Sequence, residues 1–456
     1  MKSLPTVNSS SGLIRTLRIF HSILRPLDFI EKRTRKYGDF YQITFQNSPP
    51  TLMTSNPQAI AEIFTASSDR LEVGRGNQIL RFLVGDNSLL LLDGKVHKNR
   101  RRLLMPPFHG ESLQKCSQQI VEITEKVINS WQPNQLFRVR EVMQEVTMRV
   151  ILTVVFGIDS GERYERLRQL LTQLLDIFNT PLNSSFLFFP WLQKDWGKYS
   201  PWGRFLRLKA EIKTLIYAEI QDKRELLNSE EFRDKDILTL LLLAQDDRGE
   251  GMTDEELHDE LITLLFAGHE TTASALTWLF YWIHYLPEVK DRLLAELDSV
   301  GDCADYEAIN NLPFLNAAIL ETLRIYPIAL GTFARILTKP MPIMGWDFQT
   351  NTALMISIYS LHHREDLYPN SKQFNPHRFL EKTYSNYEYI PFGGGNRRCI
   401  GSALALLEMK LVTATILSKF QLALTNNRPL SPARRGLTLS APSSFKMRVK
   451  QSIDDL

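Results

Sequence analysis

Residues 391–401 read Pro-Phe-Gly-Gly-Gly-Asn-Arg-Arg-Cys-Ile-Gly, and this stretch decides how the rest of the chain is interpreted. Residues 402–408 follow it with a helical pattern, so we expect Cys399 to lie just before a helix N-terminus. Unpaired backbone N–H groups and the positive end of the helix dipole favour a thiolate there over a thiol. The alternative is a buried, inert cysteine after an ordinary glycine turn.

The glycines and arginines around Cys399 suit a flat and acidic ligand. Three consecutive glycines allow positive φ angles, so the backbone can approach a bulky planar group closely. The two arginines can bind carboxylates. Together with a thiolate, these features suit an iron porphyrin, which carries two acidic propionates. Cys399 considered alone favours the inert interpretation. The other motifs of the chain decide between an inert cysteine and an iron ligand.

The composition is that of a large globular protein. The chain has 456 residues, of which 43% are hydrophobic, and a formal net charge of +3, too small to indicate nucleic acid as the main partner. Its three cysteines, Cys116, Cys303 and Cys399, form no CxxC pair, which argues against a disulfide framework and fits a reducing compartment. We therefore expect a cytoplasmic protein. The patterns along the chain predict one mainly helical unit with a smaller β-containing lobe, and we expect a monomer.

Residues 1–30 form a distinct segment ahead of the expected single catalytic domain, 31–456. Arg15, Arg18 and Arg25 interrupt its apolar residues, and no run of about 18 apolar residues occurs. We therefore expect neither a signal peptide nor a transmembrane anchor. A helix packed on the protein is favoured over one that lies on a membrane, which leaves peripheral membrane contact as the alternative.

A hairpin and a basic helix are expected in the first quarter of the chain. Residues 37–54 alternate apolar and polar side chains around a Pro-Pro turn, which predicts a β-hairpin. Residues 93–108 carry a dense basic cluster, in which His97 and Arg101 share one face of a helix. These two side chains could bind a carboxylate of a ligand, whereas a solvated basic face is the simpler interpretation.

An apolar, aromatic and proline-broken stretch, 178–202, lies between helical patterns at 139–156 and 206–225. This stretch is too apolar for an ordinary solvated loop. A lid over a ligand channel, a surface that contacts a membrane and a segment packed on the core all remain open.

The longest helix is expected from Thr253, which begins a capping box, to about Leu286, before a proline. Near its middle, residues 267–272 read Ala-Gly-His-Glu-Thr-Thr, which weakens a helix that must be buried. Such local inconsistency often marks a functional site. The structural alternatives are a Thr271 hydroxyl bonded to the carbonyl four residues back and a surface-facing Glu270.

A second helix, 312–327, ends at a proline and places Glu321 and Arg324 three residues apart on one face. Short strand patterns follow at 333–337 and 353–358. An ion pair between Glu321 and Arg324 would stabilise the protein little if it were exposed.

Taken in order, these motifs resemble the cytochrome P-450 family of haem-thiolate monooxygenases, from about residue 30 to the end of the chain. Each motif is weak alone, and their common order is specific. The chain departs from the family pattern at His377, where glutamate is usual, and at His97, which replaces a tryptophan. The cysteine signature is met at Phe392, Gly395, Arg397, Cys399 and Gly401, the mid-helix motif at Ala267, Gly268, Glu270 and Thr271, and the E-x-x-R motif at Glu321 and Arg324.

The resemblance implies haem b held between two lobes, with Cys399 as the iron ligand. Gly395 and Gly401 would permit close approach of the backbone to the sulfur and the porphyrin. Glu321, Arg324 and Arg378, which match the family's Glu–Arg–Arg triad, would stabilise the fold. The candidates for binding the haem propionates are His97, Arg101, Arg335 and Arg397.

On the opposite face, the resemblance implies that Gly268 lets the helix approach the iron and that Thr271 and Glu270 relay protons during oxygen activation. The electrons would come from a separate ferredoxin or flavodoxin with its NAD(P)H reductase, because the chain has no flavin or iron–sulfur domain. The expected docking face for this donor is basic and carries Lys98, Arg100, Arg102 and Arg398.

The expected reaction is hydroxylation of a C–H bond of a lipophilic substrate by O2, as in soluble bacterial, particularly cyanobacterial, members. The apolar 178–202 stretch and residues 328–333, which should face the haem, suit such a substrate. We favour a long-chain fatty acid, with a terpene as the alternative. A peroxide-dependent haem enzyme would be expected to lack the Glu270–Thr271 pair, and a non-catalytic haem sensor would consume no reductant.

Overall fold

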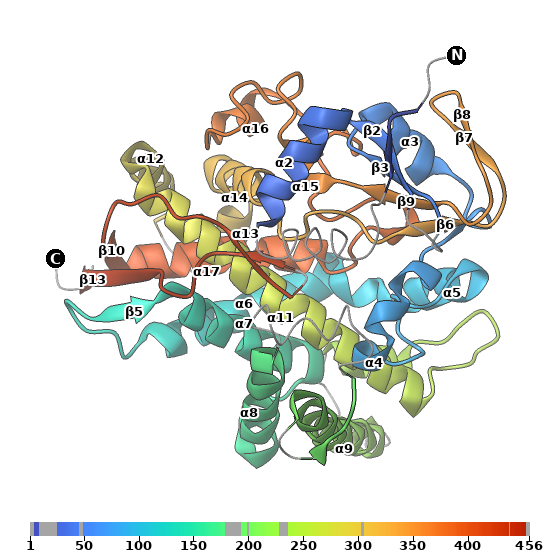
Figure 1. Cartoon of the computed structure of the whole chain (residues 1–456). Helices are drawn as coiled ribbons and strands as arrows, with labels where there is room; N and C mark the ends of the chain where they lie inside the picture. The colour runs from blue at the N-terminus through green and yellow to red at the C-terminus, as the bar shows by residue number, and fades with distance from the viewer. Residues whose placement is uncertain are drawn as a thin grey trace.

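The structure is a computed structural model that describes residues 4–8, 25–44, 49–177, 193–197, 200–227, 236–301, 305–436 and 438–452. A large helical lobe joins a smaller lobe built on a six-stranded sheet, and the long helix α11 (Asp254–Tyr285) runs diagonally through the molecule (Figure 1). The expected fold, mainly helical with a smaller β-containing lobe, is confirmed.

The six-stranded sheet has the order β1-β2-β3-β9-β6-β4 and contains the predicted hairpin, which pairs β2 with β3. Its apolar face packs on α3 (Pro57–Thr65), which begins where the Asn56 side chain accepts hydrogen bonds from two backbone N–H groups. β1 pairs with β2, and α2 (Pro26–Tyr37) spans the expected boundary at residue 31, so residues on both sides of it share one fold. The strands are β1 (Thr6–Asn8), β2 (Phe40–Thr44), β3 (Thr51–Thr54), β4 (Leu71–Glu72), β6 (Arg335–Leu337) and β9 (Ala353–Ile356).

The helical lobe has one continuous apolar core, in which Phe156, Trp278 and Leu411 are fully buried. Burial of such side chains is worth roughly 1.5–3 kcal/mol each. The larger helices around α11 are α6 (Gly110–Ile128), α7 (Val139–Phe156), α8 (Gly161–Ile177), α9 (Pro201–Leu227), α12 (Pro287–Asp298), α14 (Pro313–Ile325) and α17 (Ser402–Lys419). The shorter ones are α4 (Arg81–Val84), α5 (Gly94–Leu104), α10 (Ile237–Leu243), α13 (Tyr306–Asn310), α15 (Ile358–His362) and α16 (His377–Glu381).

Three small sheets complete the part of the fold that the structure describes. One joins β10 (Phe420–Leu424), β13 (Lys446–Ser452) and β5 (Leu136–Arg138), and a second pairs β7 (Met341–Ile343) with β8 (Trp346–Phe348). The third is the hairpin of β11 (Ala433–Arg435) and β12 (Thr438–Ser440). No helix within the described residues is long and apolar enough to cross a membrane.

α11 follows its sequence signals closely. Thr253 is the N-cap and forms the predicted capping box with Glu256. The helix is buried along most of its length, yet Ala267 in its middle is exposed and Thr271 is half-buried. These accessible residues lie between two buried stretches of the helix, so an open space adjoins the middle of α11.

The predicted ion pair Glu321–Arg324 is completely buried, with an Nε–Oε2 distance of 2.6 Å. Arg378 joins it, with its Nε 3.1 Å from Oε1 of Glu321. The backbone N–H of Asn375 also donates to Glu321, so these groups connect α14 to the loop before α16. His377 replaces the usual glutamate and accepts a hydrogen bond from Arg292 instead.

Most of the proposed lid, 178–202, lies outside the described residues, which include only 193–197 and 200–202 of it. In the described part, Trp196 is exposed and Trp202 is buried against Phe82 and Phe205. The interpretations of residues 178–202 as a lid, as a membrane-contacting surface and as a segment packed on the core therefore all remain open.

Candidate active site

The cysteine loop lies directly before α17, as predicted. The Cys399 N–H donates to the carbonyl of Phe392 at 3.0 Å, and α17 begins at Ser402. Cys399 is exposed by accessible area, although many protein atoms surround its sulfur.

The loop by itself favours a thiol, in line with the inert interpretation of the cysteine alone. Burial raises the pKa of the Cys399 thiol, and the opposing effects of the Gly401 N–H and of the Arg101 and Arg398 charges are smaller. Metal coordination deprotonates a thiol outright. A bound iron is therefore what would make Cys399 a thiolate.

The glycines of the loop are required for different structural reasons. Gly395 has a φ of +63°, and a Cβ there would lie 2.8 Å from the Phe64 carbonyl oxygen. A Cβ on Gly394 would lie 2.1 Å from the Phe64 ring, so the loop packs directly on α3. At Gly401, by contrast, a Cβ would meet no atom within 4 Å, which leaves room for a flat group beside the sulfur.

His97, Arg101, Arg335 and Arg397 come together from three separate parts of the chain. Arg397 and Arg101 both act on buried His97, whose pKa falls to about 3 through burial first and these charges second. His97 is therefore neutral near pH 7, so it could bind a carboxylate only through a hydrogen bond. Burial, and then the charge of Arg397, lowers the pKa of Arg335 to about 10.

The arginines in this group are only partly balanced by acids. Arg397 contacts the Asp93 carboxylate at 2.7 Å and the Leu92 carbonyl at 2.6 Å, but its buried Nε has no partner within the described residues. Arg335 donates to the Gly394 carbonyl at 3.4 Å and stacks on the Phe64 ring. A ligand with two carboxylates beside an open face at Cys399 fits these residues, and haem is such a ligand.

On α11, the Thr271 hydroxyl donates to the Ala267 carbonyl, which is the structural alternative considered above. Glu270 does not face the solvent freely. Its carboxylate is paired with Arg140 and accepts a hydrogen bond from Gln144 at 3.1 Å, both on α7. Arg140, which the sequence analysis missed, is buried and also donates to Ser440 at 2.6 Å.

Gly268 accommodates α7 in this structure. A Cβ at Gly268 would lie 2.7 Å from Cδ1 of Ile151, so the missing side chain allows α7 and α11 to pack closely. The close packing of α7 against α11 therefore explains why residue 268 is a glycine, without the expected approach to the iron.

The expected basic docking face needs one correction. Lys98, Arg102 and Arg398 are exposed, but Arg100 is buried and paired with Glu256 and Glu260 of α11. The helical period explains this, because Arg100 falls on the buried face of α5 with His97 and Leu104.

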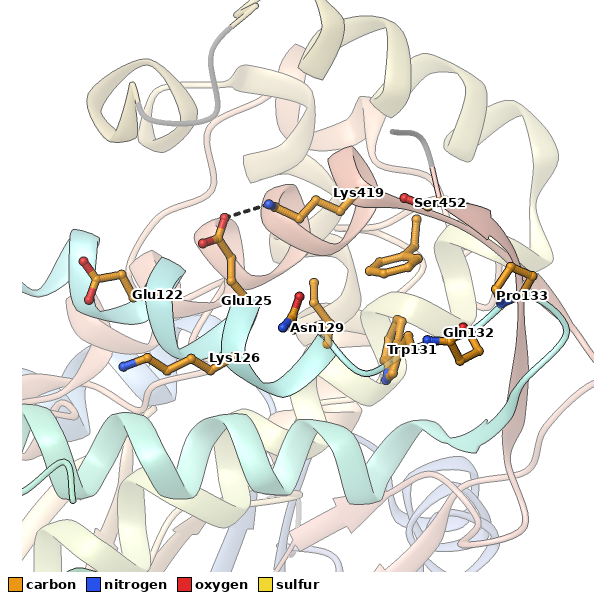
Figure 2. Close-up of a pocket in the computed structure, with 11 residues that line it drawn as sticks. Glu122, Glu125, Lys126, Asn129, Trp131, Gln132, Pro133, Lys419 and Ser452 are labelled. Carbon is orange, nitrogen blue, oxygen red and sulfur yellow. Dashed lines mark ion pairs between the residues drawn. The ribbon is translucent and has the colours of Figure 1, made fainter. Parts of the chain in front are cut away.

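A surface groove of about 630 Å³ lies between the C-terminal ends of α6 and α17 and the end of β13 (Figure 2). Trp131 and Phe420 form part of its wall, and Lys419 pairs with Glu125 at 3.0 Å. None of the predicted site residues lines this groove, so we do not assign the reaction to it.

Known proteins of one family resemble this chain over nearly its whole length. A family model described as Cytochrome P450 matches residues 18–449. Relatives named cytochrome P450 135B1 and 138, from Mycobacterium tuberculosis and Mycobacterium bovis, are 32% identical over 453 residues and 33% identical over 393 residues. These alignments cover 99% and 86% of this chain, and 92% and 84% of the relatives.

The fold also matches a solved structure described as retinoic acid bound cyanobacterial CYP120A1. The TM-score is 0.83 at 22% identity, and the match covers 99% of this chain and 100% of that one. The family match over nearly the whole chain shows that this protein belongs to the cytochrome P450 family, the haem-dependent monooxygenases.

Proposed function

We propose that this cytochrome P450 hydroxylates a long-chain fatty acid, with a terpene as the alternative substrate, and takes its electrons from a separate ferredoxin or flavodoxin served by an NAD(P)H reductase. The observation that carries the proposal is the accessible stretch at Ala267 and Thr271 in the middle of a buried helix. It provides a small apolar surface for a substrate and a hydroxyl for proton transfer.

Haem b, when bound, activates O2 and inserts one oxygen atom into a C–H bond. Cys399 would ligate its iron, and the Gly401 side of the loop would leave space for the ring. His97, Arg101, Arg335 and Arg397 would bind its propionates. Phe392 and Gly395 would fix the loop that presents the sulfur.

Thr271 and Glu270 would supply protons to the cavity. The Thr271 hydroxyl has to rotate away from the Ala267 carbonyl before it can donate toward the cavity. Glu270 is half-buried and held by Arg140 and Gln144, so its participation requires release of one of these contacts. The proton path is therefore gated by side-chain rotations on α11 and α7.

Replacing Thr271 with alanine is expected to uncouple electron consumption from product formation. Proton transfer by a positioned side chain contributes about 10²–10⁴-fold, so product per electron should fall at least about tenfold while hydrogen peroxide accumulates. NADPH oxidation, peroxide and product are measured together with a surrogate reductase.

Thr277→Ala is the matched control for this variant. Thr277 makes the same bond to the carbonyl four residues back, at 2.6 Å, but is fully buried on α11. Its loss should leave coupling near the wild-type value. Wild-type coupling in Thr271→Ala would remove this residue from the proton path.

The electron donor is expected to bind the exposed cations Lys98, Arg102 and Arg398. Attraction between a basic face and an acidic donor accelerates association most at low salt. Arg102 is already paired with Asp247 at 2.8 Å, so Lys98 and Arg398 should contribute most.

Ligand-induced changes in the haem absorption spectrum test the substrate class. The panel contains long-chain fatty acids, sesquiterpenes and retinoic acid, the ligand named for the structural neighbour, which combines an isoprenoid chain with a carboxylate. Fatty acids should shift the spectrum at micromolar concentrations and yield hydroxylated products. Terpene-only shifts would select the alternative, and no shift with any member would contradict the proposal.

A further inference from the structure

The β11–β12 hairpin lies against the accessible part of α11. Ser440 accepts a hydrogen bond from Arg140 and lies 3.4 Å, between hydroxyl oxygens, from Ser274. The Leu439 N–H donates to the Ile328 carbonyl at 2.8 Å. The hairpin therefore connects α11, one turn beyond Glu270, to the segment 328–333 that is expected to face the haem.

The register of this hairpin directs Arg435 toward α11. Ser440 pairs with Ala433, and Thr438 pairs with Arg435. Positions two residues apart on one strand share a face, so Arg435 lies on the same face as Ser440 and Arg434 lies on the other. The charges of Arg140 and Glu270 both act on Arg435, which agrees with this placement.

Arg435 is a half-buried cation without an ion-pair partner among the described residues. The Glu270 carboxylate is already taken by Arg140 and Gln144. Asp176 at the end of α8 also acts on Arg435, but it is exposed and screened by solvent. Burial first, and then the charge of Arg140, lowers the pKa of Arg435, because removal from water disfavours the charged guanidinium.

We propose that Arg435 binds the carboxylate of the substrate and so selects lipophilic acids over neutral lipids of the same chain length. The planar guanidinium can donate two parallel hydrogen bonds to a carboxylate, while the apolar chain lies along Ala267. A neutral substrate would leave these donors unpaired, which is how a polar site rejects an analogue. This inference rests on the proposed function and specifies its substrate class.

Paired ligands test the inference in haem-loaded protein. Palmitic acid is titrated against the alcohol of the same chain length, and retinoic acid against retinol, with the shift of the haem spectrum giving each Kd. Arg435→Gln should weaken binding of the acids about 10- to 100-fold, the range of a charged hydrogen bond, and leave the alcohols unchanged. Arg435→Lys keeps the positive charge but cannot donate two parallel hydrogen bonds, so it should give an intermediate loss of affinity for the acids.

Arg434→Gln is the control, because Arg434 lies on the other face and its Nε donates to the Gly436 carbonyl at 3.0 Å. It should preserve the preference for acids. If the wild type binds acids and Arg435→Gln binds them equally well, or loses acids and alcohols alike, the assignment of Arg435 is overturned and the proposed function stands. If the wild type binds no acid and no alcohol, the proposed function itself is overturned.

Discussion

Replacing Cys399 with serine will abolish product formation, even in protein that still binds haem. The arginines and His97 that we propose to bind the propionates are unchanged in this variant, so cofactor retention can be separated from reactivity. A serine hydroxyl cannot donate electron density to the iron as a thiolate does, and that donation is what favours O–O cleavage. Product and haem content are measured on the same preparation, so that loss of turnover can be distinguished from loss of haem.

Cys116→Ser is the control for this experiment. Cys116 lies half-buried on α6, where its Sγ is 3.3 Å from the Ser112 carbonyl, and burial raises its pKa to about 11. It should retain wild-type turnover. Turnover by the Cys399→Ser variant would mean that another residue ligates the iron.

Glu321→Gln will destabilise the protein more than any other single charge removal that we consider. Glu321 accepts hydrogen bonds from Arg324 at 2.6 and 2.8 Å and from Arg378 at 3.1 Å, in a site that water does not reach. Removing the negative charge leaves two buried guanidinium groups without their counter-ion. Breaking a buried pair in this way costs about 3–5 kcal/mol, so we expect a large fall in the free energy of unfolding and poor haem retention.

Glu145→Gln provides a matched comparison, because Glu145 also pairs with two arginines. Arg149 and Arg168 contact it at 2.7 and 3.1 Å, but the Glu145 side chain is 30% exposed. Ion pairs this accessible are worth about 0–1 kcal/mol. Chemical unfolding of the two variants should differ severalfold in lost stability, and equal losses would show that burial of Glu321 is not what gives the pair its importance.

Local signals predicted the helices and the cysteine loop well. The capping box at Thr253, the Asn56 cap and the proline after α11 act over a few residues, so the sequence specifies them directly. Local pattern also predicted that Cys399 precedes a helix and that Glu321 can pair with Arg324, and the structure shows both. What these features share is that their physical causes are close together in the chain.

Partners that lie far apart in the chain were harder to predict. Glu270 is paired with Arg140, 130 residues earlier, and nothing near Glu270 indicates that its carboxylate is already engaged. Arg140 is the one charged residue among the buried residues of α7, and that charge was the available signal. Arg100 was assigned to the surface as part of a basic run, although the helical period turns it toward Glu260.

The ferrous–CO absorption spectrum of the haem-loaded protein tests the central assignment most directly, namely that Cys399 is a thiolate ligand of haem. We expect the wild type and Cys116→Ser to show the long-wavelength Soret band of a thiolate-ligated haem, and Cys399→Ser to lose it. The band position depends on the axial ligand and is independent of the substrate and of the electron donor. A wild-type band at the shorter wavelength of a histidine-ligated haem, or an unchanged band in Cys399→Ser, would contradict the account.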